Sequence, residues 1–315
     1  MNSMNHMTSI DLLIDKIEQT RNPSVVGLDP RLEYIPDTLK NEIFGELGNT
    51  PKAVSEIFLR FNKSLIDALF DIVPAVKPQF AMYEQYGWEG VAAYTRTIEY
   101  AKSKGLMVIG DVKRGDIGST AEAYANGHIG EVDINGDKHR IFDEDFITIN
   151  PYLGTDAAEP FLRNCREYGK GVFVLVKTSN AGSGQIQDIL VDGEPLYQIV
   201  GKLVSEWGAG MIGKRGYSSV CAVVGATHSS QAAVLREMLP RTFFLVPGYG
   251  AQGGGAAHAK HCFDKNGGGA IVNSSRGIIA AWKSEKYAKR FKPEEFALAA
   301  REAAVEMREE LTDCK

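Results

Sequence analysis

The sequence has few cysteines, no long apolar run and no block of basic residues, and each absence excludes a class of protein. The four cysteines are widely spaced and include no Cys-x-x-Cys pair, so we predict neither a zinc site nor a disulfide framework. No apolar run approaches the length of a membrane span, and residues 1–10 do not have the composition of a signal peptide. A net charge of −5 without a basic block argues against nucleic-acid or membrane-surface binding. We therefore expect a cytoplasmic protein.

What is present indicates an ordinary globular chain. Its 315 residues are 44% apolar and 24% charged, which is enough for a substantial core in one large domain or two smaller ones. Neither an internal repeat nor a low-complexity tract divides the chain. We predict a single domain over residues 1–315, with residues 1–8 as a flexible N-terminal extension.

Eight apolar, β-branched runs recur along the chain, and most end in polar or glycine-rich turns. They cover residues 25–29, 75–80, 107–113, 146–152, 172–178, 218–225, 242–250 and 269–276. Stretches with helical spacing lie between them, at 54–70, from Ser119 onward, and at 156–168, 196–207, 229–239 and 294–310. We expect Ser119 and Glu122 to form a capping box at the start of their helix.

This alternation favours a parallel sheet with right-handed crossovers, and eight strand–helix units match the α/β class as a (β/α)₈ TIM barrel. A doubly wound open sheet is the alternative, but the first strand ends in Leu28-Asp29-Pro30-Arg31 rather than in a Gly-x-Gly-x-x-Gly loop. Two insertions are expected, after the third and fifth strands. Residues 131–145 contain Asn135-Gly136, a hairpin-type turn, and residues 182–217 exceed a usual strand–helix connection.

The most informative segment is residues 111–120, which read Asp-Val-Lys-Arg-Gly-Asp-Ile-Gly-Ser-Thr. Asp111 and Lys113 lie two apart near a strand end, so their side chains should share one face. Asp116 follows in a turn that Gly115 and Gly118 allow to bend sharply. Packing alone rarely requires acid, base and acid together, because buried charges are costly unless they are paired. This segment is therefore a candidate catalytic cluster.

Other polar residues lie at the ends of the remaining strands, where barrel enzymes carry their chemistry. Asp29 ends the first run and Lys77 lies inside the second, where a lysine is rarely buried without a partner. The fifth run ends in Lys177, Thr178 and Ser179, so that both a Schiff-base lysine and a ligand-binding hydroxyl are open interpretations.

The seventh and eighth runs end in glycine-rich loops, residues 247–255 and 273–277. Backbone N–H groups in such loops approach anions closely, and this pair of loops is the usual phosphate site of the barrel. Arg276 would supply a bidentate clamp. His228 we interpret as the start of the helix after the sixth strand, and not as an acid–base group.

The pattern Asp-x-Lys-x-x-Asp-Ile-x-x-Thr resembles the signature of orotidine 5′-phosphate decarboxylase, specifically its longer bacterial subfamily, and the resemblance extends from Asp29 to Arg276. It implies decarboxylation of orotidine 5′-phosphate to uridine 5′-phosphate, the last step of de novo UMP synthesis, without a metal or organic cofactor. By the same resemblance Lys113 would protonate C6 after CO₂ has left, and the catalytic network would comprise Lys77, Asp111, Lys113 and Asp116. The substrate would be bound by Asp29, Thr120, Ser179, Gln252 and Arg276.

The resemblance also implies a homodimer in which Asp116 and Thr120 reach the partner's site. Three other functions remain open. A sugar-phosphate decarboxylase or aldolase of the same superfamily would use Mg²⁺ at the acid cluster. A Schiff-base aldolase would use Lys177, and a catalytically inactive protein would only bind a phosphate ligand.

Overall fold

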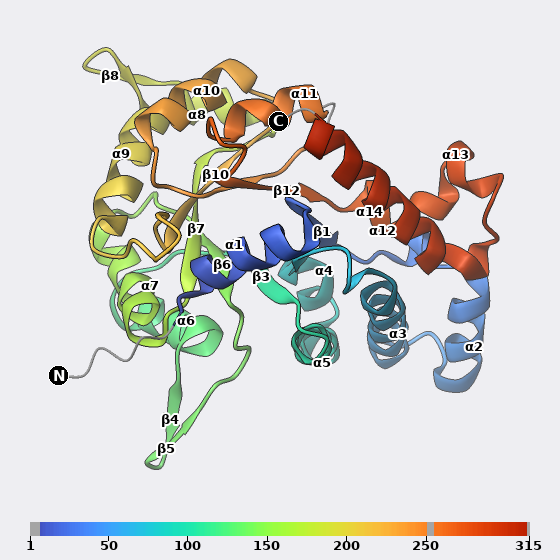
Figure 1. The fold of residues 1–315 in the computed structure, drawn as a ribbon. Helices are drawn as coiled ribbons and strands as arrows, with labels where there is room; N and C mark the ends of the chain where they lie inside the picture. Colours follow the sequence, from blue (N-terminus) through green and yellow to red (C-terminus); the bar gives the residue numbers. More distant parts are fainter. Residues whose placement is uncertain (1–6, 251–254, 314–315) are drawn as a thin grey trace.

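Eight parallel strands close into a barrel in the computed structural model, which describes residues 7–250 and 255–313 (Figure 1). Around the barrel the strand order is β1-β12-β11-β10-β7-β6-β3-β2. The strands are β1 (Ser24–Leu28), β2 (Ala75–Pro78), β3 (Met107–Arg114), β6 (Phe146–Ile149), β7 (Gly171–Lys177), β10 (Val220–Val224), β11 (Phe244–Val246) and β12 (Ala270–Ser274). Each overlaps one of the predicted runs, and the predicted barrel is confirmed.

Helices lie outside the strands and cover them (Figure 1). The longer ones are α2 (Asp37–Leu47), α3 (Pro51–Leu69), α5 (Gly87–Ser103), α6 (Gly118–Ile129), α7 (Thr155–Tyr168), α9 (Leu196–Gly208), α10 (Ser229–Met238) and α14 (Phe296–Asp313). Short helices are α4 (Phe80–Glu84), α8 (Gly184–Gln187), α11 (Ala256–Ala259), α12 (Arg276–Ile279) and α13 (Glu285–Ala288). Within the described residues, none of these helices has the length and apolar character needed to cross a membrane.

The predicted capping box of α6 is wrong. The helix begins at Gly118, so that Ser119 already lies inside the first turn. The N-cap residue is Ile117, two residues before Ser119, and it has no capping side chain. Glu122 instead pairs with Arg163 of α7 at 2.6 Å. His228 does occupy the N-cap position of α10, as predicted.

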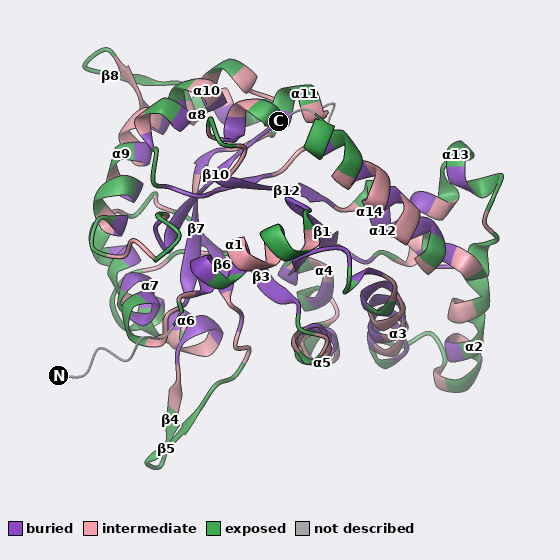
Figure 2. Ribbon diagram, viewed as in Figure 1, coloured by how far each residue is buried: buried purple, intermediate pink, exposed green. Residues whose placement is uncertain are grey.

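The barrel interior is filled by side chains from alternate strand positions, and Figure 2 shows these strands as buried. An additional helix, α1 (Ser9–Thr20), closes the amino-terminal end of the barrel with Ile10 and Leu13, and Thr8 caps it. The apolar interior consists of Val25, Ala75, Met107, Ile109, Phe146, Phe173, Cys221, Val223, Phe243, Leu245 and Ile271 together with those two residues. Cys221 is thus a small core residue, as its apolar surroundings predict.

Both insertions are present. The first forms the hairpin of β4 (Val132–Ile134) and β5 (Asp137–His139), with Asn135 and Gly136 at positive φ in the predicted turn. It follows α6 and leads into β6, so it lies at the amino-terminal end of the strands, away from the loops that follow them. The second contains α8, a small hairpin of β8 (Leu190–Val191) and β9 (Glu194–Pro195), and α9.

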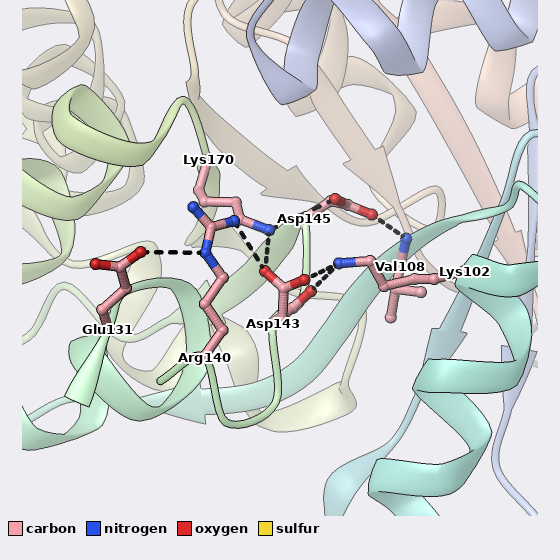
Figure 3. A network of polar contacts seen from close by, with 7 residues as sticks. All are labelled: Lys102, Val108, Glu131, Arg140, Asp143, Asp145 and Lys170. Atoms are coloured by element: carbon pink, nitrogen blue, oxygen red, sulfur yellow. Dashed lines mark hydrogen bonds and ion pairs between the residues drawn. The ribbon is translucent and has the colours of Figure 1, made fainter. Parts of the chain in front are cut away.

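A polar network anchors the first insertion to the barrel (Figure 3). Lys170 bonds to Asp143 at 2.8 Å and lies 3.7 Å from Asp145, and Lys102 of α5 also bonds to Asp143. Asp145 accepts the backbone N–H of Val108 at 2.9 Å. Burial alone would raise the pKa of Asp143, but Lys102 and Lys170 hold the pKa of this carboxyl below its usual range. The residues before β6 are therefore bonded to α5, to β3 and to Lys170 just before β7.

Candidate active site

A cavity of about 730 Å³ opens at the carboxyl ends of the strands. Seven residues singled out by the sequence line it together: Asp29, Lys77, Asp111, Lys113, Thr178, Ser179 and Arg276. They come from the ends of β1, β2, β3, β7 and β12, which are far apart in the chain. The barrel brings them to one rim because all eight strands run in parallel.

The polar residues of the cavity continue the two-residue alternation of the apolar interior. Ile109 faces the core of the barrel, and Asp111 follows it two residues later on the same face of β3. Lys77 has the same relation to Ala75, and Thr148 to Phe146. The strands are thus apolar near their beginnings and polar at their ends. Charged side chains therefore form the floor of the cavity, directly above the apolar interior of the barrel.

Asp111 lies at the centre of this floor and is buried. Its Oδ2 accepts a hydrogen bond from Lys77 Nζ at 2.6 Å and another from Gln79 Nε2 at 2.9 Å. Its Oδ1 accepts from Thr148 Oγ1 at 3.1 Å and is also bonded to Lys113 Nζ. Both carboxylate oxygens therefore have two donors each, and two ammonium groups are fixed on either side of one carboxylate.

Charge pairing overcomes desolvation in this group. Burial would raise the pKa of Asp111, but the ammonium groups of Lys77 and Lys113 hold it well below its usual range. Burial would lower the pKa of Lys77, yet Asp111 and Asp29 raise it. Asp111 and Lys77 are thus charged at neutral pH. The two lysines differ in access, since the side chain of Lys113 is 47% exposed and that of Lys77 only 5%.

Two acceptors at the cavity have no hydrogen-bond partner within the described part of the chain. Oδ1 of Asp29 and Oδ1 of Asn273 are buried without a hydrogen bond to any described residue. Buried acceptors are normally satisfied, so these two are candidates for bonds to ligand hydroxyl or amide groups. Gly27 is needed beside them, because a Cβ at that position would lie 1.9 Å from Ser275 Oγ.

Ser179 lines the cavity, whereas Lys177 does not. The pairing of β7 with β10 shifts register between Leu175 and Lys177, which interrupts the alternation of sides. Lys177 is completely buried outside the cavity, where its Nζ bonds to Asp188 at 2.7 Å and lies 5.7 Å from the ring of Tyr197. A Schiff base at Lys177 with a ligand in this cavity therefore has no structural support.

The remaining predicted residues have different positions. Arg276 is exposed at the rim, at the start of α12. Gln252 lies outside the described residues. Asp116 and Thr120 are not among the residues that line the cavity in the described part of the chain. The Asp116 carboxylate accepts a bond from the backbone N–H of Ile117, the next residue, at 2.8 Å.

The sequence reasoning did not identify several residues that line the cavity. Thr148 and Asn273 are hydroxyl and amide groups inside apolar strands, and this isolated polarity was the available signal. Gln79 also lines the cavity and donates a hydrogen bond to Asp111. Arg31 and Tyr34 lie at the two ends of a short 3₁₀ helix after β1, where the sequence has no distinctive pattern. Among the described residues, no three His, Cys, Asp or Glu side chains are grouped so that they could hold a metal ion.

Comparisons with known proteins agree on one family. A family model described as orotidine 5′-phosphate decarboxylase / HUMPS family matches residues 25–291. The chain is 43% identical over 274 residues to the orotidine 5′-phosphate decarboxylase of Caldicellulosiruptor saccharolyticus, covering 87% of this chain and 90% of the relative. It is 41% identical over 305 residues to the enzyme of that name from Rhodopirellula baltica, covering 97% and 99%.

A solved structure shows the same fold. The putative orotidine 5′-phosphate decarboxylase of Streptomyces avermitilis superimposes with a TM-score of 0.73 at 28% identity, covering 99% of this chain and 98% of that one. The similarity thus extends over the entire barrel and is not confined to the residues around the cavity.

Proposed function

Since the chain belongs to the orotidine 5′-phosphate decarboxylase / HUMPS family, we propose that it converts orotidine 5′-phosphate to uridine 5′-phosphate and CO₂ without a metal or organic cofactor. The enzyme is a carboxy-lyase of pyrimidine biosynthesis. The observation that carries the cofactor-free mechanism is the Lys77–Asp111–Lys113 cluster on the cavity floor, where two ammonium groups flank one ionised carboxylate.

In the proposed reaction the bond between C6 and the carboxylate carbon breaks, CO₂ leaves, and the electron pair stays on C6. The Lys113 ammonium stabilises this developing charge and then transfers a proton to C6, which gives the product. Lys113 is the better donor of the two lysines because it is the exposed one. Lys77 keeps Asp111 ionised and in place, and solvent returns the proton to Lys113.

The cavity supports one orientation of the nucleotide. The unpartnered Oδ1 of Asp29 would accept a ribose hydroxyl, and Ser179 would bond to the pyrimidine. Arg276, together with Gln252, would bind the phosphate at the rim. Because the phosphate is remote from C6, its binding energy can hold the substrate in the reactive geometry.

We also propose a homodimer whose two sites share Asp116 and Thr120. Neither residue lines the cavity of its own chain in the described residues, although both belong to the segment that begins with Asp111. Ile117 beside them is 58% exposed, and Tyr152 and Leu153 in the loop after the adjacent strand β6 are 80% and 46% exposed. Exposed apolar groups of this kind favour an interface between chains.

The first test is turnover in the absence of metal. We expect orotidine 5′-phosphate to be consumed, followed as a loss of ultraviolet absorbance, at the same rate before and after exhaustive chelation with EDTA. Lys77 and Lys113 provide the positive charge that a divalent cation would otherwise supply. A loss of activity that Mg²⁺ restores would contradict the cofactor-free mechanism and favour a sugar-phosphate relative.

The second test concerns the phosphate clamp. We expect Arg276→Ala to lower kcat/KM by roughly thirtyfold or more, which corresponds to a lost charge-assisted contact of at least about 2 kcal/mol. Both KM and kcat should change, because remote binding energy supports the reacting geometry. Added guanidinium should restore part of the activity.

Arg290→Ala is a matched control for this variant. Arg290 is also exposed and pairs with Glu302, and it does not line the cavity. Its replacement should leave the kinetics unchanged. Wild-type kinetics in Arg276→Ala would show that the phosphate binds elsewhere.

A further inference from the structure

Strand β3 contains a bulge at the residues proposed to act on the substrate. It pairs with β6 through Gly110 and Ile147, and pairing resumes only with Arg114 and Ile149. Three residues of β3 therefore lie opposite a single residue of β6. Lys113 within this bulge has φ 45°, in the left-handed region that is unfavourable for a residue with a Cβ. Such a conformation persists only where the surroundings hold it.

Both ends of the bulge are linked to one buried side chain, that of Glu144, the first by direct packing and the second through His128. At the first end, Gly110 packs so closely that a Cβ would lie 2.8 Å from Glu144 Oε1 and 2.9 Å from the Tyr94 hydroxyl. At the second end, Arg114 Nε donates to His128 Nε2 over 3.5 Å, and His128 Nδ1 lies 3.0 Å from Glu144 Oε1. Since Nε2 accepts a hydrogen bond from Arg114, Nδ1 carries the ring proton and donates a hydrogen bond to Glu144.

The surroundings leave this chain of contacts little freedom. The Arg114 guanidinium lies 4.9 Å from the ring of Phe80 and 4.9 Å from that of Tyr124. Phe142 stacks on His128 with ring centres 4.9 Å apart. Tyr94 of α5 donates to Glu144 Oε1 at 2.8 Å. The carboxylate thus links α5, α6 and β3.

Glu144 is fully buried, and its Oε2 has no hydrogen-bond partner among the described residues. A buried carboxylate with a free oxygen is costly, so packing alone does not account for its presence. Glu144 belongs to the first insertion, just before β6. Its neighbours in the sequence, Asp143 and Asp145, take part in the separate network of Figure 3.

We propose that Glu144, acting through His128 and Arg114, is a positioning residue that holds the β3 bulge and thereby the ammonium group of Lys113. This role rests on the proposed function, because Lys113 is the proposed proton donor. The first insertion then contributes to catalysis from outside the cavity. Its hairpin extends away from the barrel, while Glu144 at its base supports the strand that carries the reacting groups.

The kinetic test compares Glu144→Gln and Arg114→Met with Asp143→Asn as the matched control. Glu144→Gln preserves the side-chain shape, and Arg114→Met removes the donor while retaining an aliphatic stem between the two rings. We expect kcat per folded site to fall by roughly tenfold to a hundredfold in both, as for displaced catalytic groups. The KM and the affinity for uridine 5′-phosphate should remain near the wild-type values. The double variant should lose no more than the worse single variant, because both break one chain of contacts.

Asp143→Asn removes a neighbouring, partly buried interaction that does not reach the bulge. It should lower Tm without lowering kcat. A wild-type kcat in Arg114→Met, or equal kcat losses in Glu144→Gln and Asp143→Asn, would overturn the positioning role. If Glu144→Gln does not fold, Arg114→Met still decides the question, because Arg114 is only partly buried.

Hydrogen exchange separates this inference from the proposed function. Exchange of the 107–118 segment should increase in Glu144→Gln and Arg114→Met and remain unchanged in Asp143→Asn. This measurement requires no turnover. If the wild-type protein is inactive but shows these exchange differences, the proposed reaction is wrong and the positioning role of Glu144 still holds. If the wild-type protein is active and the Glu144→Gln and Arg114→Met variants exchange at the wild-type rate, only the positioning role is wrong.

Discussion

Replacing Lys113 by alanine should nearly abolish decarboxylation while leaving the product nucleotide bound. We expect kcat to fall by roughly 10⁴-fold or more, because a positioned general acid contributes about 10²–10⁴ and preorganised charge a further 10²–10³. Uridine 5′-phosphate lacks the departing carboxylate, and its contacts with Asp29, Ser179 and Arg276 would remain. Its affinity, measured by calorimetry, should therefore change little.

The geometry explains why Lys113 and not Lys77 should carry this effect. The Lys77 ammonium is enclosed and bonded to Asp111, with the charge of Asp29 nearby. Lys113 is bonded to the same carboxylate but is exposed to the cavity. When Lys113 is removed, Asp111 keeps Lys77, Gln79 and Thr148 as donors, so the cavity floor should retain its structure.

Lys177→Met provides the matched control. Lys177 is also a strand-end lysine bonded to an aspartate, but it lies outside the cavity. This variant should keep most of its activity. Substantial turnover by Lys113→Ala would remove Lys113 as the proton donor, and borohydride trapping of substrate on Lys177 would favour the aldolase function instead.

The sequence predicted the barrel, and it predicted the charged residues at the centre of the candidate site, because both depend on local patterns. Apolar runs locate the strands, and the two-residue period places Asp111 on the face of β3 that Ile109 presents to the interior. Lys113 also reaches Asp111, although it lies within the β3 bulge. Asn135-Gly136 predicted its hairpin because a tight turn requires positive φ at both positions, which both residues adopt.

The predictions that failed or were missed depend on contacts between distant segments. The side on which Lys177 lies is decided by a register shift against β10, which the sequence of β7 does not contain. Ser119 and Glu122 have the spacing of a capping box, but the N-cap position of α6 is Ile117, two residues before Ser119. Thr148 gained its role only when β6 was placed beside β3. Glu144 was one of six acids in a polar insertion until the fold buried it behind Gly110.

Mixing two inactive variants should restore about a quarter of the activity if the site is shared between subunits. Lys113→Ala and Asp116→Ala should each be almost inactive alone, the second because Asp116 would order the charged groups of the partner's site. In a two-fold dimer any residue that crosses over does so twice. Random subunit exchange makes about half of the dimers mixed, and each mixed dimer has one site with both defects and one with neither.

The control for this experiment is exchange itself, followed by native mass spectrometry of differently tagged chains. Once mixed dimers are present in the expected proportion, the activity of the mixture shows whether Asp116 acts in the partner's site or in the site of its own chain. Ile117 and Thr120, exposed beside Asp116, would be covered by the partner, so dimer formation should also protect this segment from hydrogen exchange. If mixed dimers form and the mixture stays inactive, Asp116 acts within its own chain. Its carboxylate would then have to turn from the Ile117 N–H into the cavity of its own barrel.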